Sequence, residues 1–316
     1  MASLTRREAA RLLTERDNFA IVTHRRPDGD TLGSAAVLCR GLRQLGKTAY
    51  VLENPEITAK YTQLHEGLTK PDAAADDTVI SVDVASPNML PEAFVPLKEK
   101  ILLRIDHHGT ATTFTPYELV DPDAAACGEI IWDLLTEMGA ALDVPMANAL
   151  YTAVSTDTGC FRYANTNAHS FRVVAACAEA GAELFQINQA LFETNSLGRL
   201  RLQGWLVENA LFLAEGKIVI CALPRSVEAE LGLTEDDMEN ISGFPRTIEG
   251  VKIAATLREE ASGMLKLSVR AVPGYDAAAV CARFGGGGHK GAAGASFAMS
   301  MEDGVKAVAA AMPEME

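Results

Sequence analysis

The sequence predicts an α/β protein with two domains, a parallel-sheet domain followed by a smaller α+β domain. In the first part of the chain, short and continuously apolar runs alternate with helical patterns, which is typical of parallel strands that are covered on both faces. Beyond residue 215 the predicted strands follow one another, and a hairpin signal joins two of them. The length of 316 residues also fits about two domains.

The first domain is predicted to cover residues 1–195. Its first helix follows Ser3, whose side chain can cap the helix, and apolar residues then recur at helical spacing. Short apolar runs predict four buried strands, at 19–24, 48–53, 77–84 and 100–106. Helical spacing of apolar residues predicts five further helices, at 32–46, 127–138, 145–155, 168–180 and 184–193. Gly46 stands where the first of these five helices is expected to end.

An amphipathic stretch over residues 196–215 is predicted to be a helix that links the two domains. The second domain is predicted to cover residues 216–316. It is expected to contain three strands, at 216–223, 251–259 and 264–272, and two helices, at 275–283 and 301–312. The sequence "ASG" between the last two strands predicts a hairpin.

The chain is acidic, with 42 Asp and Glu residues against 28 Lys and Arg residues and a formal net charge of −14. Long nucleic acids are usually held on a broad basic face, so we expect none to bind here. A short anionic ligand can still be held by a local positive feature, such as a bound metal ion.

The cysteine pattern and the hydropathy indicate where the protein works. The six cysteines form no CxxC pair, which fits a reducing compartment. No run approaches the roughly 18 apolar residues of a membrane span, and the amino terminus has no apolar signal core. We therefore expect a cytoplasmic protein with no membrane partner.

Acids and histidines stand where predicted strands and one predicted helix end. They lie in four places, "HRRPDGD" (24–30), Asp83, "DHH" (106–108) and Asp157. Taken singly, each place is explained as well by a solvated turn or an exposed strand end. Taken together, they are expected to meet, because the carboxyl ends of strands in an open α/β sheet form the edge where ligands bind.

Carboxylates that share one edge repel one another unless cations are bound. The charge of −4 is carried by Asp28, Asp30, Asp83 and Asp157, and two divalent ions would balance it. Oxygen and imidazole ligands without a thiolate suit Mn²⁺, and also Mg²⁺, Fe²⁺ or Co²⁺. The sequence therefore predicts a site for two divalent metal ions.

The glycine-rich run "FGGGGHKGAAG" (284–294) is a second signal. Its glycines leave backbone N–H groups open to an anion, and a helix start after them would add a favourable dipole. His289 can donate a hydrogen bond to a phosphate. The alternative is a flexible loop, but beside a two-metal site we favour a phosphate-binding role.

These motifs together resemble the DHH phosphoesterase family. The order His-x3-Asp-x-Asp, a strand-end Asp, Asp-His-His and a later Asp is similar to the catalytic domain of that family, and the glycine run resembles the signature of its associated C-terminal domain. Chain length and layout look most like the nanoRNase and pAp-phosphatase branch, the bifunctional oligoribonucleases. Thr31 stands where family members often have alanine, and this is a modest change.

The resemblance implies the ligands of each metal ion. One ion would be held by His24, Asp28 and Asp83. The other ion would be held by Asp30, Asp83, His107 and Asp157, so that Asp83 bridges the two. No ligand of either set is missing from the sequence.

The resemblance also implies catalytic and substrate-binding residues. His108 would face the scissile phosphate, and Asp106 would orient the histidines. Substrate would be bound by four residues of the second domain, Arg270, Gly287, Gly288 and His289. Weaker candidates for holding substrate are Arg25, Arg26 and Arg162.

The implied activity is that of a metal-dependent phosphodiesterase or phosphatase of the oligoribonuclease and 3'(2'),5'-bisphosphate nucleotidase type. Short oligoribonucleotides would be hydrolysed to nucleoside monophosphates, and 3'-phosphoadenosine 5'-phosphate would be a further substrate. The substrate is expected between the two domains. Two metal ions can activate a water molecule, so we expect no side-chain nucleophile and no covalent intermediate. The resemblance makes a homodimer a reasonable expectation.

Two alternatives stay open. The same site could hydrolyse cyclic or linear di-adenylate, which is a close alternative, whereas an inorganic pyrophosphatase is expected to have a more basic pocket. The alternative from another class is a nucleotide-binding regulator without turnover, which loss of a metal ligand would mark.

Overall fold

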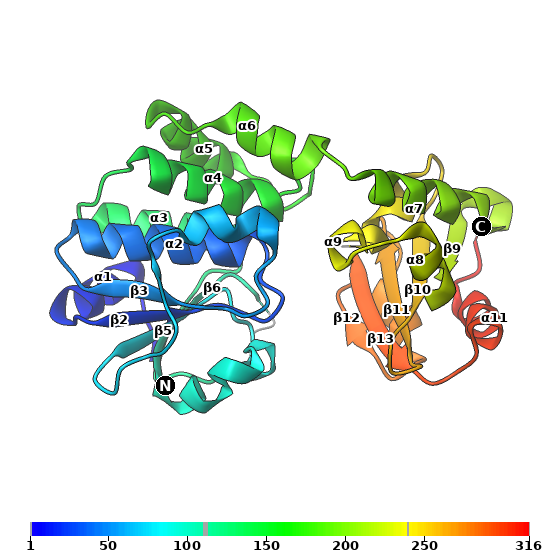
Figure 1. Cartoon of the computed structure of the whole chain (residues 1–316), viewed down its shortest axis with the longest axis horizontal. Coiled ribbons are helices and arrows are strands. Elements are labelled where there is room, and N and C mark those ends of the chain that lie inside the picture. The colour runs from blue at the N-terminus through cyan, green and yellow to red at the C-terminus, as the bar shows by residue number, and fades with distance from the viewer. Residues whose placement is uncertain (1, 110–112, 239, 316) are drawn as a thin grey trace. The chain divides into compact units, whose positions relative to one another are not determined.

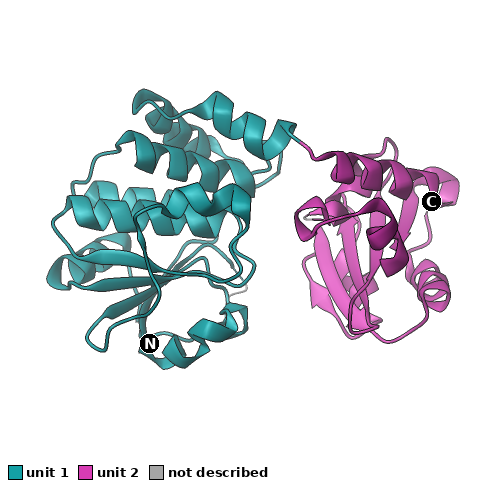
Figure 2. Ribbon diagram, in the orientation of Figure 1, with its two compact units in different colours: residues 1–194 teal, residues 195–316 magenta. Residues whose placement is uncertain are grey.

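The computed structural model of the protein describes residues 2–109, 113–238 and 240–315. The chain divides into two compact units, residues 1–194 and residues 195–316, which Figure 2 shows in different colours. Each unit has its own sheet and its own hydrophobic core.

Among the described residues, seven parallel strands form the sheet of the first unit (Figure 1). They are β1 (Ala2–Ser3), β2 (Phe19–Val22), β3 (Ala49–Leu52), β4 (Thr69–Lys70), β5 (Thr78–Val82), β6 (Ile101–Asp106) and β7 (Tyr117–Val120). Their order is β1-β7-β6-β5-β2-β3-β4, and each strand is parallel to its neighbours. The predicted α/β class is confirmed, and the four predicted strands are β2, β3, β5 and β6.

Five long helices share a core with one face of this sheet. They are α1 (Arg6–Glu15), α2 (Gly29–Gln44), α3 (Cys127–Glu137), α4 (Val144–Asp157) and α5 (Ala168–Glu179). The opposite face packs against the 3-10 segments η2 (Pro87–Met89) and η3 (Glu92–Lys100). The unit also contains η1 (Ala59–His65), α6 (Leu184–Asn188) and the π-helical turn η4 (Gln189–Glu193). Both faces of the sheet are covered, which explains its continuously apolar strands.

Two helices begin where the sequence analysis did not expect them to begin. Thr5 caps α1, and Ser3 does not: the Thr5 hydroxyl accepts from the N–H of Glu8, whose carboxylate accepts from the N–H of Thr5. Helix α2 begins at Gly29 because Oδ1 of Asp28 accepts hydrogen bonds from the N–H groups of Asp30 and Thr31. The predicted ligand Asp28 is therefore also the residue that starts α2.

In the part of the second unit that the structure describes, six strands form a mixed sheet. They are β8 (Leu211–Leu213), β9 (Ile218–Leu223), β10 (Ile253–Glu259), β11 (Leu265–Ala271), β12 (Gly287–Gly288) and β13 (Ala292–Phe297). Their order is β12-β13-β11-β10-β9-β8. Only β9 and β10 are parallel neighbours among these strands, and the predicted hairpin is β10 and β11.

Helices lie on both faces of the second sheet. On one face α10 (Ala277–Ala282) and α11 (Met301–Ala311) pack in a core with β10 and β11. The other face carries α7 (Leu197–Glu208), α8 (Arg225–Leu231), α9 (Glu235–Met238) and η6 (Ile241–Thr247). The stretch 196–215 contains α7, β8 and the start of η5 (Ala214–Gly216), and α7 belongs to the second unit. In the described part of the chain, no helix combines the length and apolar character that crossing a membrane requires.

Candidate active site

Three neighbouring strands of the first sheet end at the candidate site. Strands β2, β5 and β6 lie side by side, and His24, Asp83 and Asp106 stand at or just beyond their carboxyl ends. The loop after β2 leads into the first turn of α2, which contains Asp30, and Asp157 is the last residue of α4. These elements bring the acids and histidines to one edge of the sheet, as the sequence analysis expected.

The six residues predicted as metal ligands come together at this edge. Two groups, whose ligand atoms lie within 4.8 Å of one another, are His24 with Asp28 and Asp83, and Asp30 with His107 and Asp157. A third such group contains Asp83, His107 and His108. Because Asp83 belongs to two groups, its carboxylate stands between the two histidines that were predicted to bind different ions.

The ring nitrogens of both histidines face several carboxylates. Nε2 of His24 lies 3.6 Å from Oδ1 of Asp28 and 3.4 Å from Oδ2 of Asp83. Nε2 of His107 lies 3.3 Å from Oδ2 of Asp157 and 3.6 Å from Oδ1 of Asp83. These distances exceed an ordinary N–H···O hydrogen bond. The spacing suits ligand atoms that converge on a cation.

Hydrogen bonds on the other ring nitrogens support the same interpretation. Nδ1 of His24 lies 2.8 Å from the carbonyl oxygen of Arg25, and Nδ1 of His107 lies 3.2 Å from that of Ala124. In a neutral imidazole, an Nδ1–H that donates to a carbonyl leaves a lone pair on Nε2. Both Nε2 lone pairs would then point at carboxylate oxygens, an arrangement that becomes favourable when a metal ion or a proton lies between the nitrogen and the oxygens.

The geometry of Asp83 indicates a metal site more directly. It lies at a sharp turn directly after β5, with a φ of 57° that a residue with a side chain rarely adopts. Its side chain is 3% exposed, and its buried Oδ1 has no hydrogen-bond partner among the described residues. A buried carboxylate oxygen without a donor is costly, whereas coordination of a metal ion would satisfy it.

Asp30 is fixed more firmly than the other predicted ligands. It is fully buried, and its Oδ2 accepts from the N–H of Cys127 at 2.7 Å. Its Oδ1 accepts from the N–H of Gly128 and the hydroxyl of Ser34, both at 3.0 Å. The start of α3 therefore orients this carboxylate, since a helix amino terminus favours negative charge. Oδ2 also lies 3.7 Å from Nε2 of His107.

The carboxylates of the site are buried close together and repel one another. Burial, followed by repulsion between the acids, raises the pKa of Asp30 well above its ordinary value. Burial also raises the pKa of Asp83, and it raises that of Asp157 to about 7. Burial alone would lower the pKa of His24, but Asp28 and Asp83 outweigh it and raise the value to about 11. The donor set and its electrostatics fit a pair of divalent cations.

Asp106 and His108 form a hydrogen-bonded pair beside this group. Oδ1 of Asp106 accepts from Nδ1 of His108 at 2.8 Å and from the backbone N–H groups of His107 and His108 at 2.8 Å and 3.2 Å. The bond to Asp106 is the main reason that the pKa of His108 is raised to about 9. Burial opposes ionisation of Asp106, yet His108 and Arg104 together hold its pKa below the ordinary value.

The glycine-rich run of the second unit does not precede a helix, so the predicted contribution of a helix dipole is wrong. The run follows α10 and forms β12, a tight turn and β13, and the N–H of His289 donates to the carbonyl of Ala292 at 2.8 Å. A Cβ at Gly286 would lie 2.1 Å from the carbonyl oxygen of Gly294. Close approach of two strands therefore requires glycine there, a reason that the sequence pattern did not reveal.

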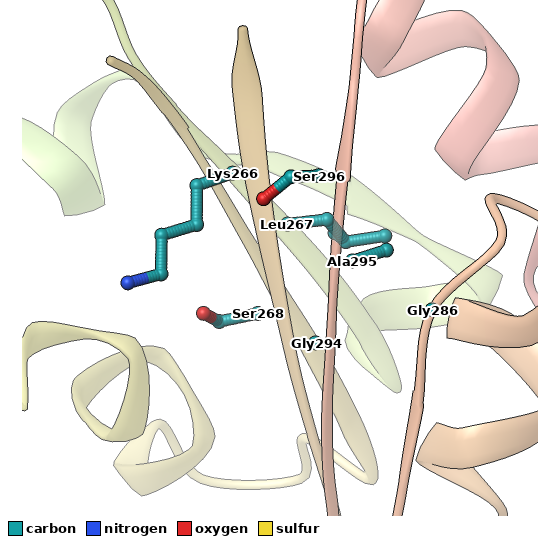
Figure 3. A pocket seen from close by; sticks show the side chains of 7 residues that line it. All are labelled: Lys266, Leu267, Ser268, Gly286, Gly294, Ala295 and Ser296. Atoms are coloured by element: carbon teal, nitrogen blue, oxygen red, sulfur yellow. The ribbon is translucent and has the colours of Figure 1, made fainter. Parts of the chain in front are cut away.

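A hollow of about 360 Å³ lies over β11 and β13 beside the glycine-rich run. Figure 3 shows the side chains of Lys266 and Ser268 on the same side of β11, with the hydroxyl of Ser296 near them. Gly294 lines the hollow, and the pairing register sets it opposite both Ser268 and Gly287. The hollow thus adjoins the predicted substrate residue Gly287.

Some polar residues of these sites were missed by the sequence analysis. Lys266 and Ser268 were missed, whereas Arg270 on the same strand was predicted. The three side chains alternate along β11 with buried residues, and this period of two is the signal that could have identified Lys266 and Ser268. Asn54 was also missed: its Nδ2 donates to the Thr23 hydroxyl at 2.9 Å and to the His24 carbonyl at 2.8 Å. Nothing in the sequence marks that long-range contact.

The three weaker arginine candidates lie near the first unit's site. Arg25 and Arg26 line an open pocket of about 510 Å³, together with Glu56, Leu90, Glu92 and Val95. Nε of Arg162 donates to the carbonyl of Gly159 at 2.6 Å, in the turn that follows Asp157. Arg162 therefore stabilises that turn.

Comparison with protein families gives two matches. Residues 18–154 match the model described as DHH family, N-terminal domain, and residues 215–314 match the DHHA1 domain. These ranges lie within the two compact units of the structure.

Curated relatives cover most of the chain. The bifunctional oligoribonuclease and PAP phosphatase NrnA of Thermus thermophilus is 33% identical over 279 residues, which are 88% of this chain and 83% of the relative. NrnA of Bacillus subtilis is 24% identical, with 92% of each chain covered. The cyclic-di-AMP phosphodiesterase GdpP of Geobacillus thermodenitrificans is 22% identical, and the match covers 88% of this chain but 44% of that protein.

Among solved structures, an exopolyphosphatase-related protein from Bacteroides fragilis has the same fold, with a TM-score of 0.83 and 24% identity over 97% of this chain and 94% of that chain. RecJ of Thermus thermophilus in complex with Mn²⁺ matches with a TM-score of 0.54 and 19% identity, over 98% of this chain and 55% of that chain. The two family matches, together with a relative 33% identical over most of its length, establish that the chain belongs to the DHH family.

Proposed function

We propose that this protein is a metal-dependent phosphoesterase that hydrolyses short oligoribonucleotides to nucleoside monophosphates. A further substrate is 3'-phosphoadenosine 5'-phosphate. The observation that carries the proposal is the buried group of acids and histidines around Asp83, whose Oδ1 has no donor in the described chain. The names of the NrnA relatives support the choice of substrates.

The proposed cofactors are two divalent ions, with Mn²⁺ the preferred metal and Mg²⁺, Co²⁺ or Fe²⁺ as substitutes. One ion would be held by His24, Asp28 and Asp83, and the other by Asp30, Asp83, His107 and Asp157. When bound, such a pair supplies an activated water at neutral pH and stabilises negative charge on the leaving oxygen. The distances between the histidine nitrogens and the carboxylates support this assignment.

His108 is proposed to act on the substrate phosphate. Its Nδ1 is engaged with Asp106, so Nε2 is the ring atom that can reach a phosphate oxygen. The ring is 35% exposed, whereas the metal-facing ring of His24 is 8% exposed. A protonated imidazole would donate to the phosphate oxygen and reduce its charge, a role that oriented donors commonly perform in phosphoryl transfer.

Recognition of the nucleotide is proposed for the second unit. Arg270 would bind a phosphate, and Gly287, Gly288 and His289 would present backbone and side-chain donors. In this proposal residues 1–195 are the catalytic domain, residues 196–215 link it, and residues 216–316 bind substrate. A cytoplasmic location and a homodimer are proposed on the sequence and the resemblance alone.

Hydrolysis of cyclic or linear di-adenylate is the second candidate, and the match to GdpP favours it. A regulator without turnover is disfavoured, because all six proposed metal ligands are present and adjacent. Such a group of buried acids would cost stability without a metal to neutralise it.

A turnover assay with Mn²⁺ tests the proposal. The substrates are a 5'-phosphorylated diribonucleotide, a 24-residue RNA, 3'-phosphoadenosine 5'-phosphate, cyclic di-adenylate and pyrophosphate. We expect rapid release of mononucleotide from the diribonucleotide, slower attack on the long RNA, and loss of both in Asp83→Ala. Turnover of cyclic di-adenylate alone would select the second candidate, and metal binding without any turnover would favour the regulator.

A further inference from the structure

A buried arginine lies behind the Asp-His-His motif. Arg104 is the third residue before His107 on β6, within an otherwise apolar run, and its side chain is 2% exposed. A buried guanidinium is costly unless carboxylates and hydrogen-bond acceptors surround it. Because β6 ends at the candidate site, the groups that Arg104 contacts bear on the geometry of that site.

The guanidinium of Arg104 connects three parts of the first unit. One terminal nitrogen lies 3.4 Å from Oδ2 of Asp106 and 3.2 Å from the carbonyl oxygen of Ala85, which follows β5. The other terminal nitrogen lies 3.0 Å from Oε2 of Glu118 on β7. The guanidinium carbon also lies 5.4 Å from the centre of the Phe114 ring. These contacts fix the arginine on several sides.

Strand register explains why these groups meet. Arg104 pairs with Glu118 across β6 and β7, so their side chains lie on the same face of the sheet. Asp106 is two residues further along β6, and therefore also projects from that face. Glu118 is held in turn, since its Oε1 accepts from the N–H of Phe114 at 3.2 Å.

Asp106 divides its two oxygens between different tasks. Oδ1 holds Nδ1 of His108, whereas Oδ2 is the oxygen that faces Arg104. Asp106 is fully buried, so no water from bulk solvent replaces a lost donor. Without the guanidinium, Oδ2 would lose its charged partner, and only the bonds to Oδ1 would still hold the carboxylate in the orientation that His108 requires.

We propose that Arg104 is a positioning residue for the reaction of this site, because it fixes the Asp106 carboxylate that orients the His108 ring. This inference rests on the proposed function. It assigns Arg104 no contact with substrate or metal. The ring of His107 is anchored separately, by the carbonyl of Ala124. Loss of Arg104 is therefore expected to change turnover more than metal binding.

Charge-matched variants separate positioning from folding. Removing Arg104 alone would leave Glu118 buried and unpaired, so the informative variant is Arg104→Gln/Glu118→Gln, with Glu118→Gln as its control. The side chain of Glu118 accepts hydrogen bonds from Arg104 and from the N–H of Phe114, and among the described residues no hydrogen bond joins it to Asp106 or His108. Arg104→Lys is a second variant. It keeps the positive charge, but its ammonium group lacks the planar guanidinium geometry that contacts both Asp106 and Glu118.

The test measures kcat and KM for a 5'-phosphorylated diribonucleotide, bound manganese and the melting temperature. For Arg104→Gln/Glu118→Gln we expect kcat to fall about 10- to 100-fold, the usual effect of losing a partner that orients a site histidine. KM and the number of manganese ions should stay unchanged, and Glu118→Gln should keep its turnover. Arg104→Lys should fold and lose part of kcat. Equal kcat in the double variant and its control, wild-type kcat in Arg104→Lys, or equal loss of manganese and kcat would each overturn the proposal.

A readout without turnover keeps this proposal distinct from the proposed function. With ¹⁵N-labelled histidine and Mg²⁺ in place of Mn²⁺, NMR detects the hydrogen bond from Nδ1 of His108 to Asp106. We expect its signal in wild type and in Glu118→Gln and its loss in the double variant. An intact signal in the folded double variant would refute positioning by Arg104. A wild-type protein that shows the signal but hydrolyses no diribonucleotide would refute the proposed function alone.

Discussion

Oδ1 of Asp83 lies 3.6 Å from Nε2 of His107, and no described residue gives that buried oxygen a hydrogen bond. The other oxygen of Asp83 lies 3.4 Å from Nε2 of His24. One carboxylate therefore stands between two imidazoles that hydrogen-bond backbone carbonyls through their other nitrogens. This arrangement becomes stable when cations lie between the ligand atoms, and several measurable consequences follow from it.

Removal of metal should lower the stability of the protein as well as its activity. A ligand that binds only the folded state stabilises it by about 2.7 kcal/mol at a concentration of 100 times its Kd. We expect EDTA to lower the melting temperature and Mn²⁺ to restore it. Asp83→Asn should show a much smaller shift on addition of Mn²⁺. An identical melting curve with and without EDTA would argue against a metal site.

The metal-free protein should lose stability as the pH rises. Burial and neighbouring acids raise the pKa of Asp157 from 3.8 to about 7, so the free energy of unfolding falls as the pH rises from 3.8 to about 7. The bond to Asp106 raises the pKa of His108 from 6.5 to about 9, so the stability that its protonated ring contributes below pH 6.5 is lost as the pH rises through 9. The two effects have the same sign.

Thermal unfolding in EDTA checks this dependence. We expect a higher melting temperature at about pH 5.5 than at about pH 8.5, since the raised pKa values span this range. The gain in melting temperature on addition of Mn²⁺ should grow with pH, because metal ligands must be deprotonated. A metal-free protein that becomes more stable towards pH 8.5 would contradict the account.

Asp157→Asn should have opposite effects on stability and activity. Without metal, the substitution removes one of several repelling carboxylates, and we expect a gain of roughly 1 kcal/mol in the free energy of unfolding. With Mn²⁺, it should lower turnover at least about tenfold. Asp133→Asn is the control, because Asp133 is a half-buried acid outside the site that pairs with Arg6 at 2.9 Å and with His169 at 3.2 Å. Wild-type turnover in Asp157→Asn would show that Asp157 is not a metal ligand required for activity.

Filling the hollow of the second unit should weaken substrate binding. A Cβ at Gly294 would meet only the carbonyl oxygen of Leu267, at 3.4 Å, so Gly294→Val can be accommodated. The added side chain would occupy the space beside Ser268 and Ser296. We expect KM for the diribonucleotide to rise about tenfold, equivalent to about 1.4 kcal/mol, with little change in kcat. Gly204→Ala on α7, where a Cβ has no neighbour within 4 Å, is the control. An unchanged KM would show that the hollow does not contribute to substrate binding.

The sequence predicted the part of the fold that positions the site, because buried parallel strands are continuously apolar and an acid at their end is conspicuous. His24, Asp83 and Asp106 were identified in this way, and the structure brings them to one edge. The short strands β1, β4 and β7 were not predicted. Strands β1 and β4 have two residues each, too few to show a period, and the four residues of β7 include the charged Glu118, which interrupts the apolar pattern.

Features that depend on strand register could not be predicted from the sequence either. Strand β13 is rich in glycine and alanine, which have low strand propensity, and it forms because it pairs with β11. Arg104 and Glu118 meet because two strands pair in one particular register. Pairing register follows from tertiary packing, so the sequence did not show that Arg104 is buried or that Glu118 is its partner.

The most direct test of the central claim is a count of manganese ions. Metal-free wild-type protein and Asp83→Asn are titrated with Mn²⁺, and free Mn²⁺ is followed by electron paramagnetic resonance. We expect two ions to bind each wild-type chain, and fewer to bind Asp83→Asn, because its carboxylate faces both histidines. No saturable binding to the wild-type protein, or equal binding to both proteins, would contradict a two-metal site bridged by Asp83.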